Sequence, residues 1–453
     1  MSAARADRAT APAPALTRVA LVITLLSALT MLAGLANKDR CVGPGFNPAG
    51  RTEPDYQARH YRDLCYSDIQ QLWIGRDINQ HVFPYVHGGI SQAGKLYGGS
   101  VEYPVLSGLL MWAGALFAHN DGQFLLGCAL LLAPFGLLTG WLLGRLAGWR
   151  ALLWAITPPL ALYAFHNWDL APVACTVAAI AVMHDPRGRR HSVARRGLWA
   201  GVLLGIGFAF KLYPGIFVAP LALYVLTARP GRPDWYGALR VVLASAGVVL
   251  AVNLPFALVG YPGWRAAITF QQLRKVDFTT NSIWYWGFRP WSNPDNRPFQ
   301  EIVSVLSPTL VLVSFAVALY LGWRQMRRIG VYPWVQVSAA MLAGFLLLHK
   351  VHSPQYMLWL LPFLVLLRIR WSWIVGYLVC DLAIGLGIFG WFYALGSGAA
   401  TIDGGWAAQA VVIGVWGRAA LLLVLFGGVV QVRRSAPGED RLLEVRDPGR
   451  AAA

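Results

Sequence analysis

The chain has 453 residues, of which 57% are hydrophobic and 13% charged, and its formal net charge is +17. Soluble domains carry about 25% charged residues, so the composition excludes an ordinary soluble protein and indicates a membrane protein. The basic residues lie at the ends of apolar segments rather than in one stripe. This placement argues against a nucleic-acid partner and favours the positive-inside rule of membrane topology.

The N-terminal region resembles a signal sequence, with Arg5, Arg8 and Arg18 before an apolar stretch. However, Val19–Ala36 is as long as a membrane span and lacks a clear cleavage site, which predicts an uncleaved first helix. We therefore expect a disordered cytoplasmic N-terminus over residues 1–15, a transmembrane domain over 16–430 and a disordered cytoplasmic tail over 431–453.

The remaining apolar segments predict an all-α polytopic bundle of about twelve transmembrane helices. The expected spans are Leu16–Ala36, Gln123–Leu143, Ala151–Ala164, Leu170–Met183, Gly197–Phe210, Pro214–Leu226, Ala238–Val259, Ile302–Trp323, Val335–Leu348, Gln355–Leu367, Trp371–Tyr393 and Ala407–Val430. Counting Pro104–Ala118 as a further span would invert every later loop, so we interpret it as a helix lying at the outer interface.

In this register the arginine runs fall on the cytoplasmic side, and nearly every carboxylate, histidine and lysine that could do chemistry falls on the outer side. Those arginines are Arg145, Arg150, the run 187–196, Arg229, Arg232, the run 324–328, Arg368, Arg370, Arg433 and Arg434. Two large outer loops result, at 37–122 and 260–301. Cys41 and Cys65 lie in the first of them, and the sequence leaves open whether they form a disulfide.

Acidic residues and a histidine at the outer helix ends are candidates for chemistry. Asp68, shortly after the first span, could be a general base or a helix-capping carboxylate, and Asp63 competes with it. Glu102 could cap the interfacial helix or contact substrate. His166 and Asp169 could form part of a polar sugar site, although Asp169 could equally cap the following helix.

Outer cations are the second group of candidates, because the positive-inside rule would otherwise deplete them. Lys211 could extend toward the interface or, with Arg289 and Lys350, neutralise a phosphate arriving from the bilayer. His352 follows Lys350 in a tight turn before Gln355, a setting less typical of a structural histidine.

Two charges fall inside predicted spans. Asp381 and Arg418 lie at similar depths in the last two spans, which are antiparallel neighbours. Either charge alone in hydrocarbon would cost several kcal/mol, so the sequence predicts a structural ion pair between them.

Five short motifs in the same order resemble those of the family 87 glycosyltransferases, membrane enzymes of the GT-C fold that use polyprenyl-phosphate sugars. The motifs are Tyr66-Ser-Asp68, Glu102-Tyr-Pro104, Asn167-Trp-Asp169, Lys211-Leu-Tyr-Pro214 and Ser353-Pro-Gln-Tyr356. The resemblance runs from the first span to about residue 370. It implies that Asp68 is the catalytic aspartate and that His352 lies in a functionally important outer turn. Ser67 stands where many GT-C enzymes have a second acid, which weakens the case for a metal-bridged pair.

The resemblance and the residues together imply an inverting hexosyltransferase at the outer face of the plasma membrane, with mannose as the expected sugar and a lipid or glycolipid as the acceptor. Asp68 would be the base, and Lys211, Arg289, Lys350 and His352 would bind the donor phosphate. Glu102, His166, Asp169 and Gln355 would contact sugar or acceptor. The sequence predicts no metal ligands and requires no cofactor, although it does not exclude a divalent metal.

Three alternatives stay open at this stage. A lipid-linked-sugar flippase or transporter would place its polar groups near the midplane and would favour repeats, which the sequence does not show. An enzyme of the same architecture could use polyprenyl-phosphate arabinofuranose. A membrane scaffold without activity would be indifferent to the loss of Asp68.

Overall fold

The computed structural model describes residues 13–184, 192–229, 231–399 and 404–431. The predicted N-terminal segment before residue 13, the arginines at 187–190, and the tail from 432 onward lie outside the described residues. Within the described part, seven helices are long and apolar enough to cross a membrane. They are α1 (Ala13–Asp39), α5 (Asp121–Ala147, continued to Ala155), α9 (Val193–Phe210), α11 (Trp235–Val259), α13 (Arg297–Ile329), α16 (Trp371–Gly396) and α17 (Gly405–Gly428).

Shorter helices complete the bundle. These are α2 (Tyr56–Arg62), α3 (Asp68–Gly75), α4 (Val105–Ala115), α6 (Leu152–Ala155), α7 (Pro158–Tyr163), α8 (Leu170–Met183), α10 (Val218–Thr227), α12 (Tyr261–Leu273), α14 (Trp334–Leu348) and α15 (Met357–Leu366). Two antiparallel hairpins, β1 (Gly45–Phe46) with β2 (Thr52–Glu53) and β3 (Gly89–Ile90) with β4 (Leu96–Tyr97), are the strands of the described chain.

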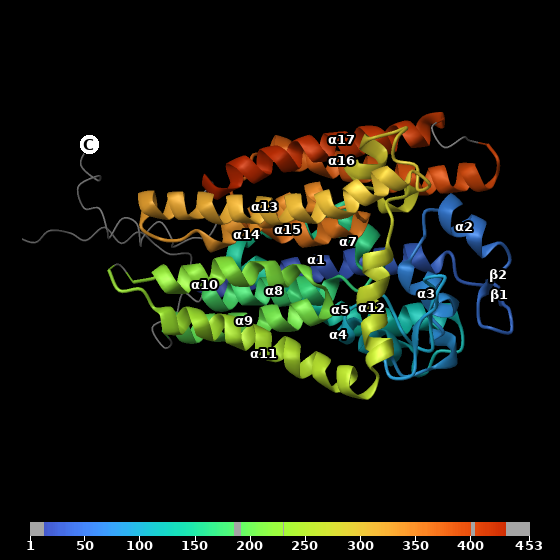
Figure 1. The fold of residues 1–453 in the computed structure, drawn as a ribbon, viewed down its shortest axis with the longest axis horizontal. Helices are drawn as coiled ribbons and strands as arrows, with labels where there is room; N and C mark the ends of the chain where they lie inside the picture. Colours follow the sequence, from blue (N-terminus) through green and yellow to red (C-terminus); the bar gives the residue numbers. More distant parts are fainter. Residues whose placement is uncertain (1–12, 185–191, 230, 400–403, 432–453) are drawn as a thin grey trace, which may run out of the picture.

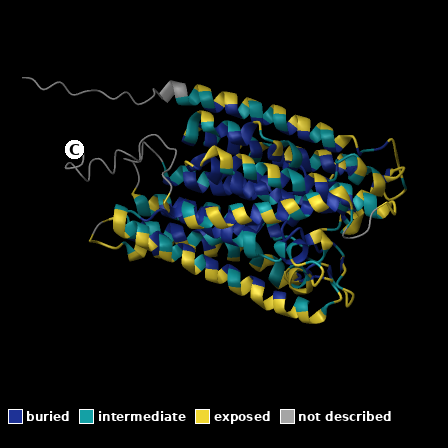
Figure 2. Cartoon of the chain, turned by 90° about the horizontal axis from the view of Figure 1, so that it is seen from above, coloured by how far each residue is buried: buried dark blue, intermediate teal, exposed yellow. Residues whose placement is uncertain are grey.

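The core of the bundle consists of the short apolar helices, and the long helices surround them. Every residue of α15 is buried, as are most of α8 and α14. By contrast, Leu243, Leu250 and Leu258 on α11 are 58%, 60% and 75% exposed. Apolar side chains on the outside and buried residues within are what a bilayer-embedded bundle requires (Figure 2).

Two predicted elements bear on the span count. Residues 151–164 were expected to form one span, but the chain forms α6 and α7, with Pro158 and Pro159 at the start of α7. Proline lacks a backbone N–H and cannot continue a helix from the preceding turn. Helix α4 has 11 residues, about 16 Å, against the roughly 30 Å of a bilayer core. Helices α10 and α15, which lie in expected spans, have only 10 residues each, so length does not decide which short helices cross. The interfacial position of α4 and the total of about twelve spans stay predictions.

The two outer loops gather at one end of the bundle. Figure 1 shows α2, α3 and the β1–β2 hairpin at that end, where α12 runs crosswise to the long helices. The connections from α10 to α11 and from α13 to α14 lie at the opposite end, and with them Arg229 and the arginines at 324–328. These arginines therefore lie at the end of the bundle opposite the two outer loops, as the sequence predicts for the arginine runs.

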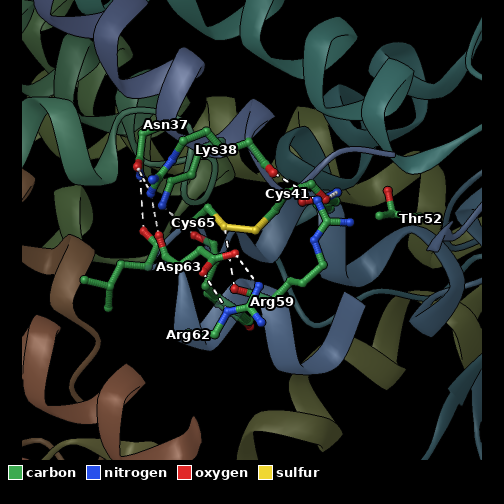
Figure 3. Close-up of a disulfide and its surroundings, with 12 residues drawn as sticks. Asn37, Lys38, Cys41, Thr52, Arg59, Arg62, Asp63 and Cys65 are labelled. Carbon is green, nitrogen blue, oxygen red and sulfur yellow. Dashed lines mark hydrogen bonds and ion pairs between the residues drawn. A yellow bond between two sulfur atoms is a disulfide. The ribbon is translucent and has the colours of Figure 1, made fainter. Parts of the chain in front are cut away.

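A disulfide ties the first outer loop to the end of α1. Cys41 and Cys65 are bonded, with their Cα atoms 6.0 Å apart (Figure 3). Asn37 donates to the carbonyl of Leu64 at 3.1 Å, and Lys38 donates to the carbonyl of Tyr66 at 2.5 Å. The segment just before α3 is therefore fixed to α1 by a covalent bond and by side-chain hydrogen bonds.

The disulfide should contribute measurably to stability. Its 24-residue separation corresponds to about 3 kcal/mol in the chain-entropy treatment of cross-links. A variant with both Cys41→Ala and Cys65→Ala should therefore unfold at lower temperature than the wild type in detergent micelles. Reductant should lower the midpoint of the wild type but not that of the double variant. Equal midpoints for the two proteins without reductant would contradict the prediction.

Candidate active site

Asp68 is the first residue of α3 and is anchored to the turn between α7 and α8. Its backbone N–H donates to the carbonyl of His166 at 2.8 Å, and Ser67 Oγ donates to the carbonyl of Phe165 at 2.8 Å. An acid in the first turn is favoured by the helix dipole, which explains why the helix begins here. These bonds place the carboxylate at the junction of the first outer loop and the bundle.

Several side chains surround the Asp68 carboxylate. Tyr66 Oη donates to Oδ1 at 2.7 Å and Asn167 Nδ2 donates to Oδ2 at 2.7 Å. Gln355 Nε2 lies 3.5 Å from Oδ2, and His166 Nε2 lies 3.9 Å from it. The Asp68 side chain nevertheless keeps 22% exposure. A carboxylate that is fixed in this way and still accessible can accept a proton from an incoming hydroxyl group.

The donors to Asp68 stay protonated. Burial raises the pKa of Tyr66 well above its usual value, and the charge and hydrogen bond of Asp68 raise it further. Asn167 also reaches Tyr103 Oη at 2.8 Å, which connects the Glu102-Tyr-Pro104 motif to the site. The phenol and the amide therefore position Asp68 without competing for its role as a proton acceptor.

Asp169 and Lys211 form a buried ion pair beside this carboxylate. Lys211 Nζ lies 2.5 Å from Asp169 Oδ1, and Trp359 Nε1 donates to the same oxygen at 2.6 Å. Burial raises the pKa of Asp169, while Lys211 opposes the rise. The ammonium also lies over the rings of Tyr103, Tyr356 and Trp359 at 5.4–5.8 Å. Lys211, expected from the sequence either to bind the donor phosphate or to extend toward the interface, is enclosed by an aromatic cage and a carboxylate.

His166 is buried and uncharged near neutral pH. Its pKa is lowered to about 4, mainly by burial, and the charges of Lys38 and Lys211 contribute to this lowering while Asp68 opposes it. Because the unfolded side chain titrates near pH 6.5, protonation favours the unfolded state below that pH. The stabilisation is complete above about pH 6.5 and is lost as the pH falls toward 4.

This linkage predicts a shallower acid response in a His166→Gln variant. Between about pH 6.5 and 4 the wild type should lose more thermal stability than the variant, because glutamine does not titrate. Unfolding temperatures measured at closely spaced pH values give both slopes. His60, whose pKa burial lowers to about 3, titrates in both proteins and does not affect the comparison. Parallel slopes would exclude His166 as a contributor.

The turn between α14 and α15 brings His352 and Gln355 to the same region. His352 is buried, its backbone N–H donates to the carbonyl of Thr280 at 2.7 Å, and its ring lies 5.4 Å from that of Tyr356. Burial lowers the pKa of His352 well below its usual value, and the charge of Arg418 adds to the effect. The ring is therefore neutral and can offer one N–H donor.

Three other predicted site residues have partners of their own. Glu102 forms a two-point ion pair with Arg76 at 2.7 and 2.9 Å. Lys350 Nζ donates to the carbonyl of Arg274 at 2.6 Å, and Arg289 Nη1 donates to Tyr285 Oη at 3.2 Å. Asp68, His166 and Gln355 are thus brought together directly, and Asp169 and Lys211 lie beside them. Glu102 and Arg289 lie in the two outer loops, and Lys350 lies in the turn between α14 and α15.

The ion pair predicted between Asp381 and Arg418 is not formed. No N–O distance within 4.0 Å joins them in the described chain, although each side chain is at least 98% buried. Asp381 instead accepts a hydrogen bond from Tyr163 Oη at 3.0 Å. Arg418 Nη2 donates to the carbonyl of Asn281 at 3.0 Å. Similar depth in the bundle therefore did not make the two groups direct partners, because each hydrogen-bonds to a residue of another segment.

A cavity and the possibility of a metal-binding group also bear on the chemistry of the site. A cavity of about 510 Å³ opens beside β2, α2 and α3, lined by residues including Arg51, Tyr56 and Gln71, and none of the predicted site residues lines it. Among the described residues, no group of three or more His, Cys, Asp or Glu side chains is arranged to hold a metal ion.

The sequence did not single out Tyr66, Tyr103, Asn167 or Trp359 as site residues. The first three lie inside motifs already recognised, next to the residues that were chosen from them. Their position in those motifs is the sequence feature that could have identified them as site residues. Trp359 lies in the apolar helix α15, where nothing in the sequence separates it from the core.

The fold and the site define an all-α, multi-pass membrane protein with a polar centre near one end of its helix bundle. The membrane-embedded helical architecture predicted from the sequence is thereby confirmed.

No protein-family model and no curated protein matches the sequence. Among solved structures, ArnT from Cupriavidus metallidurans bound to undecaprenyl phosphate is similar with a TM-score of 0.42 and 17% identity, and its apo state with 0.43 and 13%. Each alignment covers 90% of this chain and 77% of the other.

Proposed function

We propose that residues 16–430 form a GT-C-type glycosyltransferase domain that transfers a hexose from a polyprenyl-phosphate donor to a hydroxyl group of a lipid or glycolipid. The sugar we expect is mannose. The observation that carries the proposal is the Asp68 carboxylate, held by Tyr66 and Asn167 yet partly exposed. Residues from all five sequence motifs lie around it or beside it.

The chemistry needs one base and a stabilised leaving group. Asp68 takes the proton of the acceptor hydroxyl. At the same time the oxygen of that hydroxyl forms a bond to the anomeric carbon of the sugar. The bond from that carbon to the phosphate oxygen breaks, and the prenyl phosphate departs with the electron pair. Prenyl phosphate is a good leaving group and needs no general acid. A single in-line displacement inverts the anomeric centre, so a β-linked donor yields an α-linked product.

Cations and polar groups around Asp68 have supporting roles in this proposal. Lys211, Arg289, Lys350 and His352 are assigned to the donor phosphate, whose developing charge they would offset. Gln355 and His166, which lie within 4 Å of the carboxylate, are suited to contact the acceptor or the sugar. Asp169 would support sugar or acceptor binding by fixing the position of Lys211. Glu102 would do so by holding the first outer loop through its ion pair with Arg76.

We place the reaction at the extracytoplasmic face of the plasma membrane. Disulfides form in oxidising compartments, and the Cys41–Cys65 bond lies three residues before Asp68. The arginines at the opposite end of the bundle agree with a cytoplasmic location for that end.

The direct test is transfer by the purified protein in lipid nanodiscs. Labelled polyprenyl-phosphate mannose and polyprenyl-phosphate arabinofuranose would be offered separately, with a membrane lipid extract as the acceptor. We expect a labelled lipid product from the mannosyl donor that an α-mannosidase degrades. Transfer from the arabinosyl donor alone would correct the sugar. Absence of transfer from either donor, together with movement of the lipid-linked sugar across the bilayer, would replace the proposal with transport.

A further inference from the structure

Arg418 on α17 is a buried cation whose charge no carboxylate of the described chain contacts. Its side chain is 2% exposed, Nη2 donates to the carbonyl of Asn281, and neither Nε nor Nη1 has a hydrogen-bond partner among the described residues. Asp381 acts on it only through space and is held by Tyr163. Burying an unpaired guanidinium costs several kcal/mol, so an anion from outside the chain would be strongly favoured here.

Two residues on which this guanidinium acts also carry polar atoms without partners in the described chain. Both ring nitrogens of His352 and Oδ1 of Asn281 lack hydrogen-bond partners among the described residues. Both residues are at least 95% buried. The backbone hydrogen bond from His352 to Thr280 connects the turn of His352 to the segment of Asn281. Arg418 interacts with Asn281 through its hydrogen bond and with His352 electrostatically. A planar guanidinium fork beside an imidazole N–H suits the several acceptor oxygens of a phosphate.

The cluster lies close to Asp68 without contacting it. Gln355, three residues after His352, reaches within 3.5 Å of the Asp68 carboxylate. On the other side, Tyr163 links Asp381 to His166, whose ring lies 6.0 Å away. In an in-line displacement the base and the leaving group lie on opposite sides of the sugar carbon. The phosphate is therefore expected near Asp68, with one sugar ring between them.

We infer that Arg418, together with His352 and Asn281, binds the phosphate group of a polyprenyl phosphate. The inference rests on the proposed function and gives its donor site a cation that the sequence had assigned to an internal ion pair. A lipid phosphate is favoured over a free one because α17 lies at the edge of the bundle. Its residues Ile413 and Leu423 are 67% and 61% exposed, so a prenyl chain can lie along the apolar outer face of the same helix, which points away from Arg418.

Direct binding tests the inference with protein in nanodiscs and three probes: undecaprenyl monophosphate, a polyprenol of the same length, and inorganic phosphate. Wild type should prefer the lipid phosphate over both others. Arg418→Gln should weaken its binding by about 10- to 100-fold, the effect of one or two lost charged hydrogen bonds. Asp381→Asn is the control, because Asp381 acts on Arg418 only through space and hydrogen-bonds to Tyr163 rather than to the cluster. This variant should bind the lipid phosphate like wild type.

A second variant keeps the test decisive if Arg418→Gln does not fold. Asn281→Asp is nearly isosteric, and aspartate tolerates the left-handed backbone at this position (φ 45°) as asparagine does. The new carboxylate would occupy the guanidinium, so the variant should unfold at higher temperature than wild type but bind undecaprenyl monophosphate more weakly. A purely structural arginine would give stabilisation without loss of binding.

The inference is overturned if Arg418→Gln or Asn281→Asp binds undecaprenyl monophosphate like wild type, or if wild type binds the polyprenol or inorganic phosphate equally well. These outcomes leave the proposed function standing when sugar transfer from a prenyl-linked donor is observed. Conversely, Arg418-dependent binding without any transfer would retain the phosphate site and remove the enzyme.

Discussion

Replacing Asp68 with asparagine should reduce sugar transfer by about 100- to 10,000-fold, the usual contribution of a positioned general base. Asparagine has the same shape and can still accept hydrogen bonds through its carbonyl oxygen, but it cannot take the proton of the acceptor. The loss should appear in kcat, with little change in the binding of the prenyl-linked donor. Initial rates at saturating donor and equilibrium binding of undecaprenyl monophosphate measure the two quantities separately.

Asp63→Asn is the matched control. Asp63 lies five residues earlier in the same loop, where Arg62 contacts it at 2.9 Å and its hydrogen bond lowers the pKa of this carboxyl. Its side chain is 32% exposed, and the amides of Asn167 and Gln355 are directed to Asp68 instead. The variant should transfer sugar at the wild-type rate. An active Asp68→Asn protein, or an inactive Asp63→Asn protein that binds donor, would move the base away from residue 68.

Breaking the buried pair of Asp169 and Lys211 should destabilise the fold by about 3–5 kcal/mol, the range observed when one partner of a buried ion pair is removed. In Asp169→Asn the ammonium of Lys211 would stay enclosed by three aromatic rings without its counter-ion. In Lys211→Met the carboxylate would be left unpaired, with only Trp359 as a donor. Unfolding in mixed micelles reports the free energy of each variant.

The double variant separates a pair interaction from two independent losses. With both charges removed, no buried ion is left uncompensated, so the combined loss should be smaller than the sum of the single losses by at least about 1 kcal/mol. Additive single effects would mean that the 2.5 Å contact contributes no specific coupling.

Composition and hydropathy were sufficient to predict the membrane bundle, because each long span has to be apolar along its whole length. The same pattern cannot show where a helix breaks, and Pro158 divides an expected span into α6 and α7. Nor does similar depth in two spans show which hydrogen-bond partner a buried charge takes. For that reason Asp381 and Arg418 were paired from the sequence, whereas each has another partner.

The candidate site was only partly accessible to sequence reasoning. Asp68 and Gln355 could be chosen from their motifs and outer location, and the structure brings them within 3.5 Å. The hydrogen bond from Asn167 to Asp68 joins residues 99 positions apart, and no local pattern encodes it. The aromatic cage of Lys211 likewise depends on the packing of α15 against the bundle.

The attachment of the segment around Asp68 has a consequence for how molecules reach it. The disulfide, Lys38 and the bonds to Phe165 and His166 clamp this stretch to α1 and to the α7–α8 turn. Lifting it as a flap would require breaking all of them at once. Reactants must therefore enter and leave past a stationary carboxylate, through openings between other parts of the chain.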